Sequence, residues 1–183
     1  MRIALSGLKR SGKDTIGERL VSKYGFHRYA FADKLKEVAK ELFPEEFEKT
    51  DKPVELLQWL GDKMRERDPE VWIKYLVRQI DEWRGPEDNI VVTDVRYPNE
   101  VSILKKLGFV VVRVHAPIET VISRCVATEK DFKPELLNHS SERMAMEMKE
   151  RNYAHYTIRN IGTLEELYQR VDVLVSMLKR IGL

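Results

Sequence analysis

Short apolar runs alternate along the chain with longer segments in which apolar residues recur every three or four positions. The short runs, some of them rich in β-branched and aromatic residues, are typical of buried strands, and the longer segments are typical of amphipathic helices. The pattern predicts five strands, at Ile3–Ser6, Phe26–Phe31, Ile90–Thr93, Phe109–His115 and Thr157–Ile161.

Helices are expected between these strands, with bounds set by glycine, proline and capping residues. Asp68-Pro69 combines a cap residue with a proline suited to the first helical position, and Thr163 to Glu166 has the spacing of a capping box. We expect helices over about 13–23, 33–42, from 54 onward, 69–83, 98–107 and 164–178.

Strands that alternate with helices predict an α/β fold with a mostly parallel sheet and right-handed connections. Ligands of such sheets bind beyond the carboxyl ends of the strands. We therefore expect one cleft, lined by loops at Gly7–Gly12, Phe31–Lys36, Asp94–Asn99 and Ala116–Arg124.

The composition is that of a folded, soluble chain that we expect to form one domain: 183 residues, 43% hydrophobic and 34% charged. A net charge of +2 is too small to indicate a nucleic-acid surface. No apolar run reaches the roughly 20 residues that span a bilayer, and the first strand is not expected to be a leader. The single cysteine, Cys125, makes a cytoplasmic location the default expectation. Nothing in the pattern indicates an oligomeric state.

The segment from Gly7 to Thr15, Gly-Leu-Lys-Arg-Ser-Gly-Lys-Asp-Thr, has the spacing glycine, four residues, glycine, lysine. It lies between an expected strand and an expected helix, which is the context in which this spacing forms a phosphate-binding loop. Backbone N–H groups of such a loop surround phosphate oxygens, and the lysine carries a charge to the terminal phosphates. We expect a nucleoside triphosphate to be bound by Gly7, Lys9, Arg10, Ser11, Gly12, Lys13, Asp14 and Thr15.

The residue after the lysine is usually Ser or Thr, whose hydroxyl ligates Mg²⁺, but here it is Asp14. Either Asp14 holds a metal-bound water or Thr15 supplies the hydroxyl. The alternative is that Asp14 is simply a favourable acid in the first turn of a helix.

Asp94 ends an apolar strand, where enzymes with a phosphate loop usually keep an acid that holds Mg²⁺ or its water. The alternative is a turn or capping aspartate. Two residues on, Arg96 is placed to reach a phosphate at the mouth of the sheet, unless it pairs with an acid such as Glu100.

Seven segments resemble phage-type deoxynucleoside monophosphate kinases, which also place aspartate after the lysine of the loop. They span nearly the whole chain: Lys9–Thr15, Phe31–Lys36, Leu57–Arg65, Asp68–Trp72, Thr93–Glu100, His139–Glu142 and Ile158–Leu164. The resemblance implies the nucleoside monophosphate kinase fold, with a five-stranded parallel sheet, an acceptor-binding region over about 33–84 and a lid over about 124–152.

The same resemblance implies roles for single residues. On the acceptor side, Lys36 and Arg65 would grip the acceptor's phosphate while Arg96 approaches from the sheet. The alternative for Lys36 and Arg65 is that they only solvate helix surfaces.

On the donor side, Lys13 would bind the donor phosphates and stabilise the negative charge that develops on the transferring phosphoryl group. Arg124 would bind the donor phosphates from the lid. Asn160 would lie in the turn where such kinases bind the adenine of ATP through backbone contacts. Arg143 and Arg151 are candidate lid arginines. The alternative is that they only form salt bridges with nearby acids.

The implied activity is Mg²⁺- and ATP-dependent transfer of a phosphoryl group to a (deoxy)nucleoside monophosphate, giving the diphosphate and ADP. Lys13, Arg124 and Asp94 are the expected catalytic residues. Animal-type phosphomevalonate kinases share the loop and the Asp-x-Arg segment, and so remain an alternative. A nucleotide-binding regulatory module is a second alternative, although cations outside the phosphate loop favour a second anionic ligand.

Overall fold

The computed structural model describes residues 1–83, 85, 88–128, 137, 139–144 and 153–183. These residues divide into two compact units, Met1–Arg28 with Glu87–Leu183, and Tyr29–Pro86. Within the described residues, no helix is long and apolar enough to cross a membrane.

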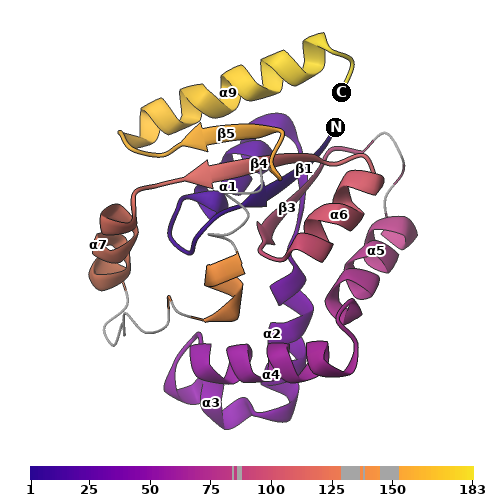
Figure 1. Cartoon of the computed structure of the whole chain (residues 1–183), viewed down its shortest axis with the longest axis vertical. Coiled ribbons are helices and arrows are strands. Elements are labelled where there is room, and N and C mark those ends of the chain that lie inside the picture. The colour runs from indigo at the N-terminus through magenta and orange to yellow at the C-terminus, as the bar shows by residue number, and fades with distance from the viewer. Residues whose placement is uncertain (84, 86–87, 129–136, 138, 145–152) are drawn as a thin grey trace. The chain divides into compact units, whose positions relative to one another are not determined.

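The first unit is built on a five-stranded sheet in the order β2-β3-β1-β4-β5 (Figure 1). β1 is hydrogen-bonded in parallel to β3 on one side and to β4 on the other, and β4 pairs in parallel with β5. All strand ends that carry candidate site residues therefore lie at the same edge of the sheet. The strands are β1 (Arg2–Ser6), β2 (His27–Tyr29), β3 (Ile90–Val95), β4 (Val110–His115) and β5 (Tyr156–Arg159).

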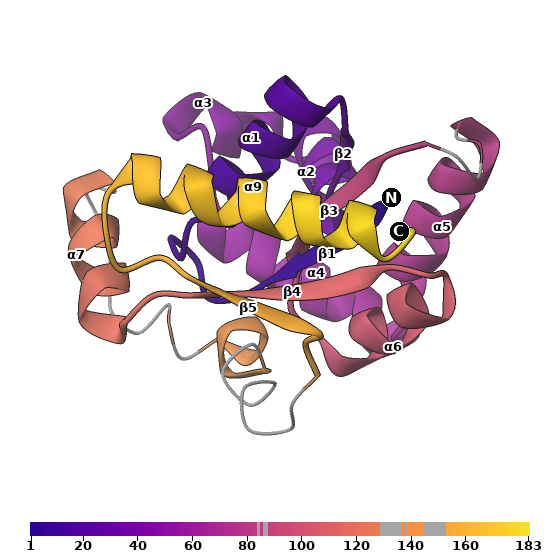
Figure 2. The same cartoon turned by 90° about the horizontal axis from the view of Figure 1, so that it is seen from above.

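Helices cover both faces of this sheet, as Figure 2 shows, with α1 and α9 on one face and α6 on the other. The main core fills the α1 and α9 side, where Leu20 and Val171 have no exposed surface. Gly17 lets α1 approach β3 closely, since a Cβ there would lie 2.7 Å from the Thr93 side chain. The helices of this unit are α1 (Lys13–Tyr24), α6 (Pro98–Lys106), α7 (Ile118–Thr128) and α9 (Leu164–Arg180).

Asp172 of α9 links the two helices on that face through polar contacts. Its carboxylate accepts two hydrogen bonds from the Arg19 guanidinium, at 2.8 and 3.3 Å, and one each from Lys23 and the Tyr24 hydroxyl, both at 2.8 Å. These hydrogen bonds, that of Arg19 first, hold the pKa of Asp172 far below its ordinary value.

The second unit is helical. Leu35 of α2 packs at Gly61 of α4, where a Cβ would lie 3.3 Å from the leucine side chain. The buried Trp72 of α5 donates its indole N–H to the Gly61 carbonyl at 3.4 Å. Trp59 is 52% exposed and meets Phe43 edge-on. The helices are α2 (Phe31–Leu42), α3 (Pro44–Lys49), α4 (Val54–Arg67) and α5 (Val71–Trp83).

The predicted alternation of strands and helices is confirmed, with several differences in bounds. Phe31 begins α2 rather than ending a strand, so Phe31–Lys36 is a helix start and not a loop. Residues 118–124 likewise form the first part of α7. α3 was not predicted, because its six residues are too few to show a helical period. The capping box at Thr163 is confirmed by its hydrogen bonds with Glu166, at 2.8 and 3.2 Å.

The Asp172 contacts predict a pH-dependent contribution to stability. We expect Asp172→Asn to lower the melting temperature by roughly 3 to 6 °C at pH 7. Because the folded-state pKa is depressed, this contribution is present above the unfolded value of about 3.9 and disappears as the pH falls further. The difference in Tm between variant and wild type should thus be constant above about pH 5 and shrink below about pH 4.

Thermal melts followed by circular dichroism between pH 3 and pH 8 measure this difference. Glu46→Gln is the matched control, because Glu46 forms an exposed pair with Lys49 at 2.8 Å and such pairs contribute little. A deficit for Asp172→Asn no larger than that of the control would contradict the assignment.

Candidate active site

The phosphate loop holds three residues at positive φ, namely Gly7 (145°), Arg10 (56°) and Gly12 (106°). Gly7 and Gly12 are also crowded. A Cβ on Gly7 would lie 2.4 Å from the Val114 carbonyl oxygen, and one on Gly12 would lie 2.3 Å from Asn160 Nδ2. Both glycines are therefore required by backbone conformation and by space. The loop turns tightly and ends with Gly12 as the N-cap residue of α1.

Asn160 braces this loop from the end of β5. Its side-chain amide donates to the Ser11 carbonyl at 2.9 Å, and its backbone N–H donates to the His115 carbonyl at 2.7 Å. The residue is buried. The implied adenine contact stays a prediction, and the side-chain contact with the loop was not foreseen, because sequence shows no direction for a side chain after a strand.

Lys13 is only 5% exposed, and its ammonium donates to the carbonyls of Gly7 and Leu8 at 2.9 and 2.6 Å. Burial, and next the guanidinium of Arg96, lower the pKa of Lys13 to about 7, against the opposing effect of nearby carboxylates. The lysine is thus held within the loop, and an incoming phosphate would favour its charged form.

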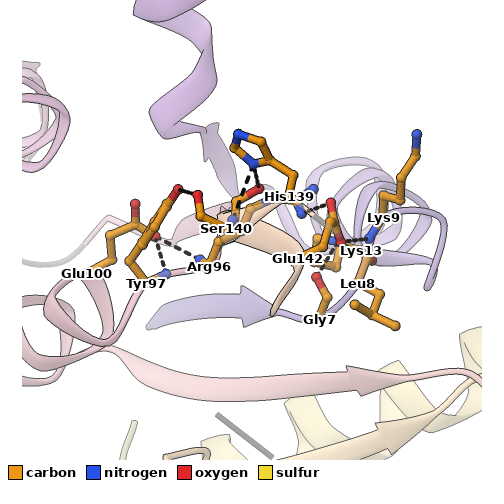
Figure 3. A network of polar contacts seen from close by, with 11 residues as sticks. Gly7, Leu8, Lys9, Lys13, Arg96, Tyr97, Glu100, His139, Ser140 and Glu142 are labelled. Carbon is orange, nitrogen blue, oxygen red and sulfur yellow. Dashed lines mark hydrogen bonds and ion pairs between the residues drawn. The ribbon is translucent and has the colours of Figure 1, made fainter. Parts of the chain in front are cut away.

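Arg96 follows β3 and reaches a buried carboxylate, that of Glu142 (Figure 3). Burial acts to lower the pKa of Arg96, but the charges of Glu142 and Asp94 outweigh it, so that the arginine stays ionised. Glu142 also accepts a hydrogen bond from the backbone N–H of Lys9 at 3.0 Å. Glu100 bonds to the backbone of Arg96 instead, accepting its N–H at 2.7 Å. The partner of the guanidinium is therefore Glu142.

Glu142 was not among the predicted site residues, although it ends the segment His139–Glu142 on which the family resemblance partly rests. A single glutamate in a chain with many acids gives no sign of burial. Only the pairing of Arg96 with a carboxylate 46 positions away identifies it.

The candidate metal residues lie on the two elements next to the loop. Asp94 is half-buried at the end of β3, and its charge acts on both Lys13 and Arg96. Asp14 is exposed and Thr15 half-buried in the first turn of α1. No group of three or more histidine, cysteine, aspartate or glutamate side chains suited to a metal occurs among the described residues. Mg²⁺ usually takes one or two protein oxygens together with water and phosphate, so Asp14, Thr15 and Asp94 stay predicted ligands.

The remaining predicted residues fall into three groups. Arg124 of α7 donates to the Arg10 carbonyl at 3.1 Å, which brings a second arginine to the loop. Lys36 and Arg65 belong to the second unit, on helices α2 and α4 that pack together. Arg143 is exposed next to Glu142, whereas Arg151 and much of the predicted lid lie outside the described residues.

The loop fits the phosphates of a nucleotide. The Ser11 hydroxyl is buried and has no hydrogen-bond partner among the residues that the structure describes. A buried hydroxyl without a partner is costly, so a ligand or water that bonds to it is expected. Together with Lys13 and the start of α1, this hydroxyl suits an anionic group.

Solved structures with the same fold include shikimate kinases. A shikimate kinase from Acinetobacter baumannii, in complex with shikimate, aligns over 97% of this chain and 94% of its own, with 19% identity and a TM-score of 0.60. The protein TT1252 from Thermus thermophilus aligns over 97% of both chains, with 23% identity and a TM-score of 0.62. The chain therefore has a P-loop kinase fold.

Sequence comparison gives the family and two viral relatives. The chain belongs to the AAA domain family, whose model matches residues 3–145. It is 29% identical over 142 residues, 63% of this chain and 74% of the other, to a protein of Acanthamoeba polyphaga mimivirus named "Putative deoxynucleotide monophosphate kinase". It is 30% identical to the "Uncharacterized protein ORF77" of Ictalurid herpesvirus 1, over 76% of this chain and 64% of that protein. Phosphoryl transfer is the class of chemistry that these findings support.

The crowding at Gly12 predicts that even a small side chain disables the loop. We expect Gly12→Ala to weaken ATP binding roughly tenfold or more, because a Cβ both strains the backbone and collides with Asn160. Calorimetric titration with ATP and Mg²⁺ measures the affinity. Gly108→Ala is the control, since Gly108 also has positive φ (79°) but a Cβ there meets nothing within 4 Å. Equal affinities for the two variants would disprove the crowding argument.

Proposed function

We propose that the chain transfers a phosphoryl group from ATP, with Mg²⁺, to a (deoxy)nucleoside monophosphate, giving the diphosphate and ADP. The mimivirus relative named as a deoxynucleotide monophosphate kinase supports this acceptor class. The P-loop kinase fold and the motifs of the phage-type kinases support the same chemistry.

One observation favours a phosphorylated acceptor above all others. Two cations from different elements, the buried Lys13 of the loop and the half-buried Arg96 after β3, lie close enough that the charge of Arg96 lowers the pKa of Lys13. Two cations close together and shielded from water repel each other, so a site that keeps both is suited to a ligand with more than one phosphate group. A site that bound only the phosphates of ATP would not need a second cation such as Arg96.

The residues of the chain then have separate tasks. Bound ATP with Mg²⁺ supplies the transferable phosphoryl group. Lys13 and the loop N–H groups bind and orient the donor phosphates, and Arg124 adds charge beside Arg10. Arg96 binds the acceptor phosphate, and the family resemblance implies the same role for Lys36 and Arg65. Asp94, with Asp14 or Thr15, holds the metal or its water.

A phosphomevalonate-type acceptor is the second candidate, because that family shares the loop with aspartate after the lysine. Both acceptors present a phosphate to the same cations and differ only in the rest of the molecule. A regulatory module would bind ATP without acceptor-dependent turnover.

The test is Mg²⁺-dependent ADP release from ATP with each deoxy- and ribonucleoside monophosphate, phosphomevalonate and shikimate. We expect stimulation by at least one nucleoside monophosphate, loss of activity when Mg²⁺ is chelated, and a decrease of about 100-fold or more in Lys13→Ala. Stimulation by phosphomevalonate alone would replace the proposed acceptor, and ATP binding without any stimulation would favour a regulatory module.

The roles in the second unit are tested by two neighbouring lysines of α2. Lys36→Ala should raise the KM of the acceptor about tenfold and leave that of ATP within about twofold, because an ion pair with a phosphate is lost. Lys34→Ala is the control, since Lys34 is paired with Glu37 at 2.6 Å and lies 5.4 Å from the Tyr75 ring centre. Equal effects of the two changes on acceptor KM would contradict the role of Lys36.

A further inference from the structure

The Glu142 carboxylate joins two walls of the phosphate site. It is 4% exposed, and its two oxygens have different partners. Oε2 accepts the backbone N–H of Lys9 in the phosphate loop at 3.0 Å, and Oε1 pairs with the Arg96 guanidinium after β3. Figure 3 shows the carboxylate between these groups, with Lys13 alongside.

The helical turn that carries Glu142 is fixed to the same part of the sheet by a second contact. Ser140 lies 3.2 Å from the hydroxyl of Tyr97, the residue after Arg96. Within the turn, the Glu142 backbone N–H bonds to the His139 carbonyl at 3.0 Å. The carboxylate therefore approaches Arg96 from a turn that is itself held in place.

Neighbouring charges determine the ionisation state of Glu142 and Arg96. Burial acts to raise the pKa of Glu142, but the charge of Arg96 and the Lys9 N–H outweigh it and lower that pKa, so the carboxylate is ionised. A half-buried guanidinium that loses its carboxylate is destabilised until another acid takes its place. Asp94 is the candidate, because its charge already acts on Arg96 more strongly than that of Glu100, and it is also a predicted metal ligand.

We propose that Glu142 is a positioning residue that holds Arg96 against the phosphate loop, so that the guanidinium meets the phosphate of the acceptor and stays away from Asp94. The expected change in acceptor KM rests on the proposed function. The contact by which Glu142 orders the Arg96 side chain does not depend on the substrate. The two oxygens of the carboxylate allow Glu142 to join an N–H of the loop to a cation that follows β3.

An alternative role for Glu142 predicts the opposite change in acceptor binding when the carboxylate is removed. If the carboxylate instead filled the place of a phosphate and competed with it, its removal would strengthen acceptor binding. The sign of the change in acceptor KM therefore separates positioning from competition.

The kinetic experiment compares Glu142→Gln with the wild type in the full chain. Glutamine keeps the volume and one oxygen for the Lys9 N–H, but it removes the charge that holds Arg96. We expect the acceptor KM to rise about tenfold and the ATP KM to change less than threefold. In an Arg96→Ala background the same substitution should have no further effect on acceptor KM, because coupled residues are not additive.

Ser141→Ala is the control for damage to the turn, because its hydroxyl bonds to His139 at 3.0 Å and to neither wall of the site. A matching rise in acceptor KM in this control would show a structural effect and overturn the proposal. A lower acceptor KM in Glu142→Gln, or an undiminished effect in the Arg96→Ala background, would do the same.

A second measurement stands apart from any substrate. Nitrogen-15 relaxation of the Arg96 side-chain Nε, assigned by comparison with Arg96→Ala, reports whether the guanidinium is ordered. We expect an ordered signal in the wild type and a mobile one in Glu142→Gln. An ordered Arg96 side chain in both the wild type and Glu142→Gln would overturn the proposal that Glu142 positions it. If no acceptor supports turnover in the wild type, the proposed function fails, yet this measurement still decides whether Glu142 holds Arg96.

Discussion

The parallel hydrogen bonding of β1 between β3 and β4 is the constraint on which the site depends. Because the three strands run in the same direction, the phosphate loop after β1 has Asp94 and Arg96 on one side. On the other side lie the β4 and β5 ends that supply Val114 and Asn160. The loop is thus shaped by its neighbours as well as by its own glycines.

Buried charge distinguishes this site from an ordinary glycine-rich turn. Lys13 is buried and Arg96 half-buried, and the charges of Glu142 and Asp94 act on both. Burying unpaired charge costs much more than a surface ion pair gains. An anionic ligand would offset this cost, as the proposed phosphoryl transfer requires.

Carboxylates that accept several hydrogen bonds occur in two different parts of the molecule. Asp172 collects three donors far from the phosphate loop and links α1 to α9. Glu142 makes comparable contacts next to the loop, where each partner is also a predicted ligand-binding group. The same chemistry of carboxylate and cation thus links two helices in one place and joins predicted ligand-binding groups in the other.

The sequence by itself determined the α/β alternation, the phosphate loop and the helix starts at Lys13, Pro98 and Leu164, because these depend on local periodicity, glycine and caps. Tertiary structure decided the partner of Arg96, the brace from Asn160 and the burial of Lys13. These depend on side chains brought together from distant segments, as with the 149 positions between Ser11 and Asn160. Local patterns fix where strands end, but only sheet order and packing fix which side chains meet there.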